Sequence, residues 1–204
     1  MRPADLARRI AERAPGTERL VVAIAGPPAA GKSTLAAAVR DALPDRSAIL
    51  GLDAFHYDDA ILVERSQRDR KGAPFTFDLD GYRRCLRTLV DATETEVAVP
   101  VFDRALELSR SAAEIVPPSY DVIVTEGNYL LLDEDDWPSL APLFDLTVYV
   151  DVPMQVVRER ILDRWRRHGL SANEAELRAE TNDLLNAETV VRRSRPADIT
   201  IVNT

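Results

Sequence analysis

The sequence has little cysteine and no long apolar run, and each shortage excludes a class of protein. Cys85 is the only cysteine in 204 residues, so an internal disulfide and a cysteine-based metal cluster are excluded. No apolar run approaches the ~18 residues that a membrane-spanning helix needs. Because Met1–Leu6 lacks the apolar core of a signal peptide, we expect a cytoplasmic protein. The net charge of −8 argues against nucleic acid and anionic membranes as partners.

Lysine is also scarce, since only Lys32 and Lys71 occur among the 26 basic residues and the others are arginines. Such a bias is typical of genome composition. An ammonium, however, is a compact point charge, whereas a guanidinium is a broad planar fork. The alternative to a genome-composition effect is that the two lysines occupy positions where arginine would not serve.

Short apolar strands alternate with helix-like stretches, which predicts an α/β protein with a mainly parallel sheet. We expect strands at 20–25, 48–52, 97–102 (an edge strand, because of Pro100), 122–125, 146–150 and 199–202. Helices are expected at 4–14, at 32–43, after Asp78 or Asp80, after Pro153 and after the capping box Ser171–Glu174. Ligands of such sheets bind beyond the carboxyl ends of the strands, where Gly26, Asp53, Glu126 and Asp151 stand.

The strongest motif joins the first strand to the following helix and fits G-x-x-x-x-G-K-[ST]. Its residues are Gly26, Pro27, Pro28, Ala29, Ala30, Gly31, Lys32 and Ser33, followed by Thr34. The glycines allow a tight turn whose N–H groups point at phosphate oxygens, and the helix N-terminus adds positive potential. Lys32 is expected to reach the β- and γ-phosphates and the Ser33 hydroxyl to bind Mg²⁺.

A phosphate loop alone does not define the reaction. The sequence has no guanine-reading Asn-Lys-x-Asp, which excludes a switch GTPase. Motor-type ATPases place an Asp at the tip of their Walker B strand. The corresponding strand here is 122–125, and it has Asp121 at its start and Glu126 at its tip. A small-molecule kinase needs a carboxylate that accepts the proton of the acceptor hydroxyl. Asp53 ends the second strand at the loop's edge of the sheet and suits that role, with a helix N-cap as the alternative.

Further motifs follow the phosphate loop in order: Leu52–His56, Arg70–Pro74 with Thr76–Asp78, Pro100–Arg104 and Val124–Tyr129. Together these motifs resemble the P-loop kinase superfamily of uridine kinases, phosphoribulokinases and bacterial pantothenate kinases. Within it, the short fructose transport system kinases, or nucleoside/nucleotide kinase family proteins, are the most similar branch. The resemblance implies one P-loop kinase domain over 1–204, a three-layer α/β/α sandwich with a five-stranded, mainly parallel sheet. It also implies a helical lid at about 158–175 and leaves a homodimer open.

The resemblance also implies roles for individual residues. Asp53 matches the catalytic carboxylate, and Glu126 matches the acidic residue beside Mg²⁺, together with Ser33. Arg164 and Arg167 are the candidate lid arginines over the phosphates. Arg195 begins the stretch Arg195–Asp198, which resembles the loop that passes the adenine, and is a candidate nucleotide-binding residue. Candidate acceptor residues are His56, Arg70, Lys71, Asp103, Arg104, Glu126 and Tyr129.

The sequence thus predicts an ATP- and Mg²⁺-dependent kinase that phosphorylates a hydroxyl of a small molecule, with a fructose-like sugar as the leading acceptor. A uridine-like nucleoside or a pantothenate-like compound is the alternative. Uridine kinases put an aromatic pair straight after their Asp, whereas Ala54–Tyr57 reads Ala-Phe-His-Tyr here, which counts against a pyrimidine nucleoside. An alternative of another class is a regulatory ATPase module that has no acceptor.

Overall fold

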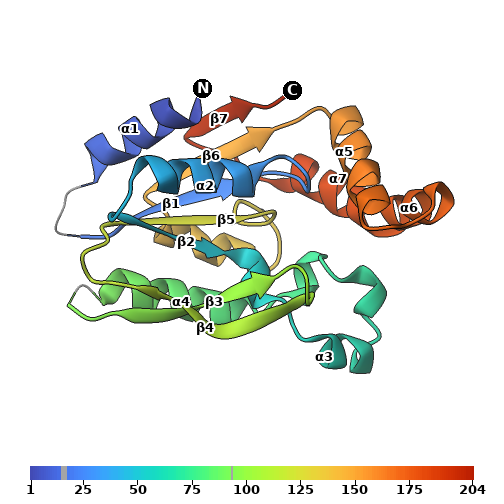
Figure 1. The fold of residues 1–204 in the computed structure, drawn as a ribbon, viewed down its shortest axis with the longest axis horizontal. Helices are drawn as coiled ribbons and strands as arrows, with labels where there is room; N and C mark the ends of the chain where they lie inside the picture. Colours follow the sequence, from blue (N-terminus) through green and yellow to red (C-terminus); the bar gives the residue numbers. More distant parts are fainter. Residues whose placement is uncertain (15–17, 93) are drawn as a thin grey trace.

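A computed structural model describes residues 1–14, 18–92 and 94–204. Its central sheet has five parallel strands in the order β2-β5-β1-β6-β7 (Figure 1). Their bounds are β1 Leu20–Ala25, β2 Ser47–Gly51, β5 Val122–Gly127, β6 Leu146–Asp151 and β7 Ile199–Val202. Each coincides with an expected strand to within two residues at either end, so the predicted parallel α/β fold is confirmed.

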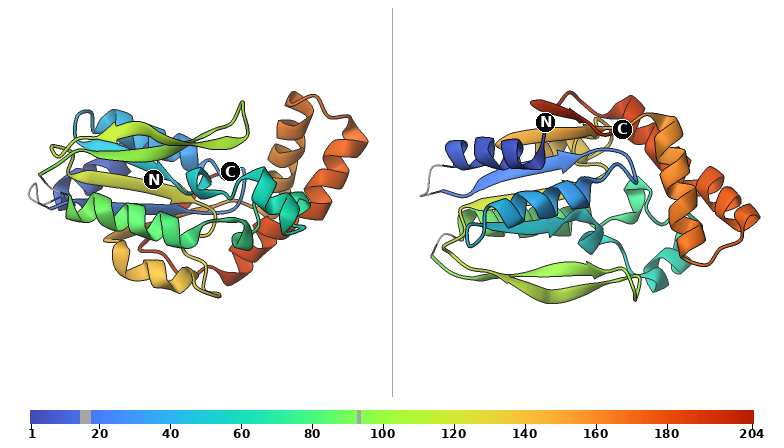
Figure 2. Two further views of the ribbon diagram at one scale, coloured as in Figure 1. Left: turned by 90° about the horizontal axis from the view of Figure 1, so that it is seen from below. Right: turned by 45° about the horizontal axis from the view of Figure 1, so that its top comes forward.

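The sheet is buried on both faces, which explains why its strands read as continuous apolar runs. Along β1, Val21 and Ala23 pack into one apolar cluster while Val22 and Ile24 pack into the other. Figure 2 shows the helices on either side of the sheet. Helices α1 (Pro3–Arg13) and α2 (Lys32–Ala42) cover one face, and α4 (Leu79–Asp91) covers the opposite face. This is the three-layer α/β/α arrangement that we expected.

A two-stranded antiparallel hairpin lies beside the main sheet and was only half predicted. Strand β3 (Val97–Asp103) pairs with β4 (Leu108–Val116), and the register shifts between Val99 and Val101, around Pro100. The expected strand at 97–102 is thus real, but it belongs to this hairpin and not to the edge of the parallel sheet. Strand β4 was missed because most of its side chains are exposed, which leaves no apolar alternation to detect.

The remaining helices gather beyond the carboxyl ends of the parallel strands, as the right-hand side of Figure 1 shows. Their bounds are α3 Asp59–Glu64, α5 Met154–Arg167, α6 Ala172–Arg178 and α7 Leu184–Arg193. The capping box of Ser171 and Glu174 starts α6, as predicted. A π-helical turn, Ala179–Asp183, joins α6 to α7. Across the described ranges, every helix is too short or too polar to cross a bilayer.

Candidate active site

The phosphate loop has the conformation that its glycines predict. Gly26 has φ +151° and Gly31 has φ +91°, the left-handed range that L side chains rarely adopt. A Cβ on Gly26 would also lie 2.6 Å from the carbonyl oxygen of Val150 in β6. From α5, Arg160 donates to the Ala29 carbonyl (3.4 Å), and Asn203 donates to the Ala30 carbonyl (2.8 Å). The loop is therefore bound to the fold on both sides.

Lys32 is buried at the base of this loop, and its ammonium faces oxygen atoms. Its Nζ donates to the Pro27 carbonyl (2.9 Å) and to Oδ1 of Asn128 (2.7 Å), just after β5. Burial lowers the pKa of the Lys32 ammonium, whereas the negative charges of Glu126 and Asp53 act in the opposite direction. Lys32 thus supplies a buried positive charge at the base of the loop, beside the place where a phosphate would bind.

Ser33 and Glu126 form an oxygen pair beside the loop, since the Ser33 hydroxyl donates to Oε1 of Glu126 at 2.9 Å. Burial raises the pKa of the Glu126 carboxyl, and the nearby Asp53 adds to this effect. A cation between these oxygens would offset the free-energy cost of burying the negative charge of the carboxylate. Mg²⁺ prefers hard oxygen ligands and commonly takes only one or two from the protein. Ser33 and Glu126 therefore fit Mg²⁺, although the described residues contain no cluster of three or more metal-ligating side chains.

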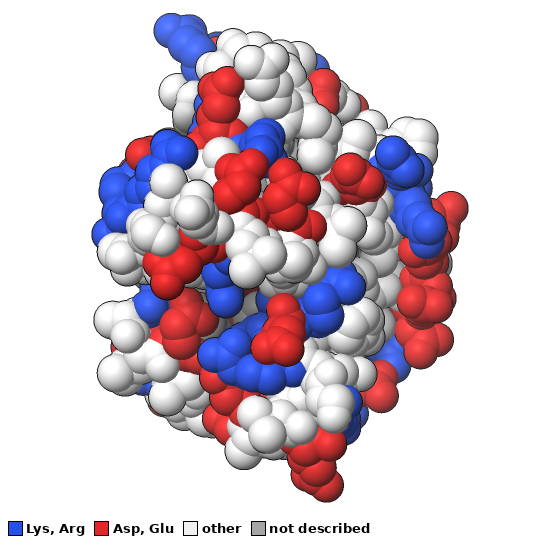
Figure 3. Space-filling view, turned by 90° about the vertical axis from the view of Figure 1, so that its right-hand side faces the viewer, with Lys and Arg blue, Asp and Glu red and all other residues white. Residues whose placement is uncertain are grey.

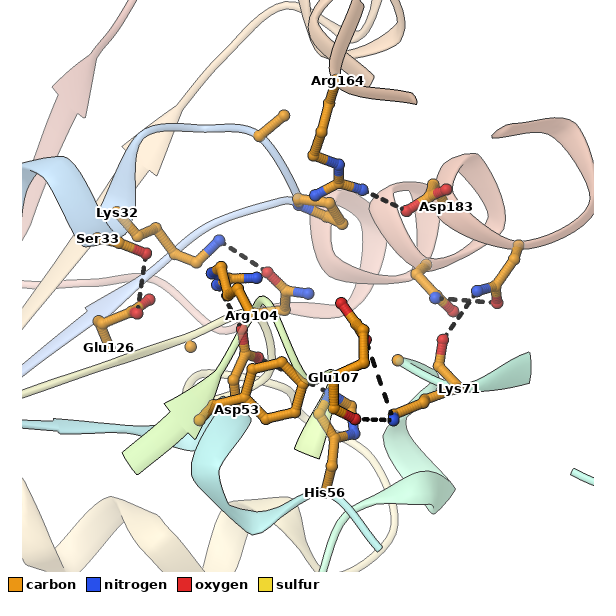
Figure 4. Close-up of a pocket in the computed structure, with 18 of the residues that line it drawn as sticks. Lys32, Ser33, Asp53, His56, Lys71, Arg104, Glu107, Glu126, Arg164 and Asp183 are labelled. Atoms are coloured by element: carbon orange, nitrogen blue, oxygen red, sulfur yellow. Dashed lines mark hydrogen bonds and ion pairs between the residues drawn. The ribbon is translucent and has the colours of Figure 1, made fainter. Parts of the chain in front are cut away.

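Asp53 lies at the same edge, in a 3₁₀ turn (Leu52–Phe55) that directly follows β2. The turn's N-cap is Gly51, so the alternative role of Asp53 as a helix N-cap is not supported. Its Oδ2 accepts a hydrogen bond from Nη2 of Arg104 (2.7 Å), and its Oδ1 lies 3.9 Å from Nε2 of His56. Lys32, Asp53 and Arg104 line the same cavity, and Figure 4 shows Asp53 below Lys32 in that view. A carboxylate thus faces the phosphate loop across an open space.

The segment after α3 supplies a second lysine, Lys71, whose side chain is largely buried. The Nζ of Lys71 donates to Oδ1 of Asp59 (2.7 Å) and to the Glu107 carbonyl at the tip of the β3–β4 hairpin (2.9 Å). Its side chain is only 8% exposed. Tyr129, buried behind the segment, donates its hydroxyl to the Gly72 carbonyl at 2.6 Å. These bonds hold the segment against the hairpin and β5.

The end of α5 presents Arg164 to the cavity. Its Nη2 donates to Oδ1 of Asp183 at 2.7 Å. Arg167, one turn further, lies on an exposed face and pairs with Asp163 of its own helix. Spacing alone did not distinguish the two arginines, because residues three apart are neighbours on the surface of a helix. Packing of α5 against the π-helical turn favours Arg164.

These elements enclose a cavity of about 420 Å³. The structure brings most of the predicted residues to its lining: Pro28, Ala29, Gly31, Lys32, Ser33, Thr34, Asp53, His56, Lys71, Arg104, Glu126 and Arg164. Gly26, Pro27 and Ala30 form the inner side of the loop. Other predicted residues lie outside the lining: Arg70, Asp103, Tyr129, Arg167 and Arg195. Arg70 bonds Asn182, Asp103 accepts from the hairpin turn and pairs with Arg110, and the Arg195 N–H donates to the Leu131 carbonyl.

The lining also contains residues that sequence analysis missed. They are Gly72, Phe102, Glu107, Gly127, Asn128, Trp165, His168, Arg178, Asn182, Asp183 and Asn186. Four of them lie inside the motifs named above: Gly72, Phe102, Gly127 and Asn128. The motifs marked these segments but did not show which of their residues line the cavity. Asn182, Asp183 and Asn186 come from the π-helical turn and α7, where the sequence carries no motif.

Gly127 is a position where a small change should disturb the site. A Cβ there would lie 2.5 Å from Cβ and 2.8 Å from Cδ2 of Leu52, the neighbour of Asp53. We expect Gly127→Ala to lower the free energy of unfolding by about 1–3 kcal/mol through overpacking, and to reduce turnover as Asp53 shifts. Urea unfolding and steady-state kinetics measure both effects. Gly51→Ala is the matched control, because its Cβ would lie 3.8 Å from Glu126, and it should change stability by less than about 0.5 kcal/mol.

The phosphate loop follows the first of five parallel strands, has a lysine at its base and faces a carboxylate. These features define a nucleotide-binding protein of the P-loop kinase class. The profile of the Phosphoribulokinase / Uridine kinase family matches residues 21–172, and the chain belongs to this family. It is an ATP-dependent kinase of small molecules.

Similar proteins span nearly the whole chain. A presumed uridine kinase of Schizosaccharomyces pombe, C227.14, is 31% identical over 97% of this chain and 88% of its own length. YggC of Escherichia coli K12, an uncharacterised protein, is 34% identical over 90% of this chain and 77% of its own. The crystal structure of a presumed fructose transport system kinase from Silicibacter sp. TM1040 superposes with a TM-score of 0.90 and 37% identity. That match covers 98% of this chain and 99% of the other.

Proposed function

We propose that this kinase transfers the γ-phosphoryl group of ATP, with Mg²⁺, to a hydroxyl of an uncharged polyhydroxyl acceptor, of which a fructose-like sugar is the leading example. The observation that supports this choice is the charge balance at the Asp53 end of the cavity. There Arg104 pairs with Asp53 (2.7 Å), and Lys71 pairs with Asp59 (2.7 Å).

An anionic acceptor needs cations that are free to pair with it. Lys71 is engaged by Asp59 and by the Glu107 carbonyl, and the Glu107 carboxylate lies 4.0 Å from its Nζ. A carboxylate or phosphate on the acceptor would therefore compete with groups already in place and meet their negative charge. Figure 3 shows this end of the molecule, where acidic and basic side chains alternate. An uncharged acceptor fits this balance better than a sugar phosphate or a pantothenate-like acid.

The walls of the cavity also suit a sugar. Phe102 offers an aromatic face, with its ring centroid 5.6 Å from that of His56, and His56 stacks on Phe77 at 4.0 Å. Carboxylate and amide groups of Glu107, Asn182 and Asn186 line the same space. A sugar ring needs an apolar platform for its C–H face and several donors and acceptors for its hydroxyls. The name of the Silicibacter protein points to the same class of acceptor.

In this proposal each group has one task. The loop amides and Lys32 would bind the β- and γ-phosphates, and Ser33 and Glu126 would hold Mg²⁺. Asp53 would orient the acceptor hydroxyl and take its proton. Bound Mg²⁺ would neutralise phosphate charge as it develops. Arg164 faces the phosphates from the lid and, with Trp165, helps to exclude water. In this structure Arg104 is hydrogen-bonded to Asp53, so the acceptor hydroxyl has to displace Arg104 from that carboxylate.

The test is a coupled ADP-release screen over sugars, polyols, nucleosides, pantothenate and sugar phosphates, with a magnesium-free sample as a control. The proposal predicts the largest rise in ADP release with an uncharged sugar or polyol, and a loss of that rise without Mg²⁺. A preference for an anionic acceptor or for a nucleoside would contradict the acceptor class. A rate that no compound raises would favour a regulatory ATPase module.

Lys71→Arg tests the acceptor side separately. The Lys71 side chain is only 8% exposed, and its ammonium lies between Asp59 and the hairpin tip. A larger guanidinium cannot reproduce both of its bonds there. Loss of one of these two bonds should displace the wall of the cavity that Lys71 and Glu107 form. We therefore expect the KM for the acceptor to rise by about tenfold, while the KM for ATP stays within twofold. Steady-state kinetics with each substrate varied in turn measures this. Unchanged acceptor kinetics would show that Lys71 has no role at the acceptor.

A further inference from the structure

Asp183 is a buried carboxylate whose role the proposed function does not yet use. It ends the π-helical turn Ala179–Asp183 and is 8% exposed. Both of its oxygens bind the end of α5: Oδ1 accepts from Nη2 of Arg164 and Oδ2 accepts from Nε1 of Trp165, each at 2.7 Å. A buried carboxylate with two such donors, on consecutive residues of another helix, holds that helix end in one orientation.

The turn that carries Asp183 is itself anchored to the acceptor side. Asn182, the preceding residue, donates to the Lys71 carbonyl at 2.8 Å and accepts from Nε of Arg70 at 3.2 Å. Two successive residues of the turn thus bond different sides of the cavity. Asn182 bonds the segment around Lys71, and Asp183 bonds α5. Single π-helical turns are concentrated at functional sites, because the extra residue re-aims side chains.

Among the described residues, Asp183 holds Arg164 through one nitrogen, Nη2. In the described part of the chain, its Nε is buried without a hydrogen-bond partner. The guanidinium lines the cavity that contains Lys32 and Ser33, and Figure 4 shows it pointing from α5 towards that space while its tip touches Asp183. Trp165 supports this position, with the Arg164 and Arg178 guanidinium carbons 5.1 and 4.2 Å from its ring centroid. The Nη1 of Arg164 makes no hydrogen bond within the described residues, so the N–H groups of that nitrogen are available to a phosphate group.

We infer that Asp183 is a positioning residue that orients Arg164 towards the terminal phosphate of the bound triphosphate. This inference rests on the proposed function, in which Arg164 meets the phosphates. A long arginine on a lid has many rotamers, and fixing it beforehand removes an entropic cost from binding. Asp183 acts on the nucleotide only through Arg164, so its effect should disappear when Arg164 is absent.

The experiment is a double-mutant cycle on ligand affinity. Wild type, Arg164→Met, Asp183→Asn and the double variant are titrated calorimetrically with Mg²⁺–AMP-PNP, a non-transferring triphosphate, and with Mg²⁺–ADP. We expect Arg164→Met to weaken AMP-PNP binding by about tenfold or more, and Asp183→Asn by about five- to tenfold. ADP affinity should change by less than twofold in both, because ADP lacks the terminal phosphate. The double variant should bind AMP-PNP as Arg164→Met does.

Two controls separate positioning from loss of structure. Glu180→Gln changes a carboxylate of the same π-helical turn that pairs with Arg158, and it should bind both nucleotides as wild type does. Trp165→Phe removes only the second donor to Asp183 and should weaken AMP-PNP binding by a smaller factor. Circular dichroism and thermal melting verify that each variant is folded at the titration temperature.

Each contrary outcome has a distinct meaning. Equal weakening of AMP-PNP and ADP by Asp183→Asn, no weakening at all, or additive losses in the double variant would overturn the positioning role while leaving the proposed function intact. Wild-type AMP-PNP affinity in Arg164→Met would refute the phosphate role of Arg164 in the proposed function, and the positioning role with it.

Discussion

Asp53→Asn should reduce phosphoryl transfer by about 10²–10⁴-fold while ATP binding stays within a few fold of wild type. The amide cannot take the proton of the acceptor hydroxyl, yet Asp53 lies across the cavity from the loop that would bind the triphosphate. Rapid-quench measurement of transfer and calorimetric titration with Mg²⁺–AMP-PNP separate the two effects.

The structural cost of this substitution should be small. Asp53 is 30% exposed and its partner Arg104 is 63% exposed, and an ion pair of this kind contributes about 0–1 kcal/mol. The thermal midpoint should therefore stay close to that of wild type. Arg104→Gln is the matched control, since it removes the same ion pair and keeps the carboxylate. Normal turnover by Asp53→Asn would refute the role of Asp53 as the proton acceptor.

Lys32→Ala has the second large expected effect. Its ammonium is the buried positive charge of the phosphate loop, and its loss should reduce kcat/KM for ATP by about 10²–10³-fold. Lys32→Arg should be nearly as damaging, because the space between the Pro27 carbonyl and Asn128 accommodates a point charge and not a planar fork. Steady-state kinetics at varied ATP measures both variants.

Asn128→Ala is the control for Lys32, because it removes one of the two oxygen partners of the ammonium and leaves its charge. It should reduce kcat/KM for ATP far less than Lys32→Ala does. Undiminished activity of Lys32→Ala, in a protein that melts as wild type does, would contradict the assignment of the loop.

The part of the site that depends on local chain geometry could be predicted from the sequence. The spacing of Gly26, Gly31, Lys32 and Ser33 specifies a loop whose shape depends mainly on its own backbone. Asp53 and Glu126 were also predictable, because the carboxyl ends of parallel strands share one edge of the sheet. These groups do meet around one cavity.

The part that depends on packing between distant segments could not be predicted. Asn182 and Asp183 bond residues of the 68–72 segment and of α5, and their roles follow from a π-helical turn for which the sequence has no marker. Which of the two lid arginines, Arg164 or Arg167, lines the cavity likewise depends on the π-helical turn that packs against α5. The hairpin partner of β3 escaped detection because β4 buries little of its surface, so its residues show no period of two.

We propose above all that the enzyme transfers the terminal phosphoryl group of ATP to a hydroxyl of an uncharged sugar. Phosphorus-31 NMR of a reaction with ATP, Mg²⁺ and the best uncharged acceptor from the screen tests it most directly. We expect a phosphomonoester signal that grows in step with ADP in the presence of the wild-type enzyme and is absent with Asp53→Asn. Growth of inorganic phosphate alone, at the same rate with or without any acceptor, would contradict it.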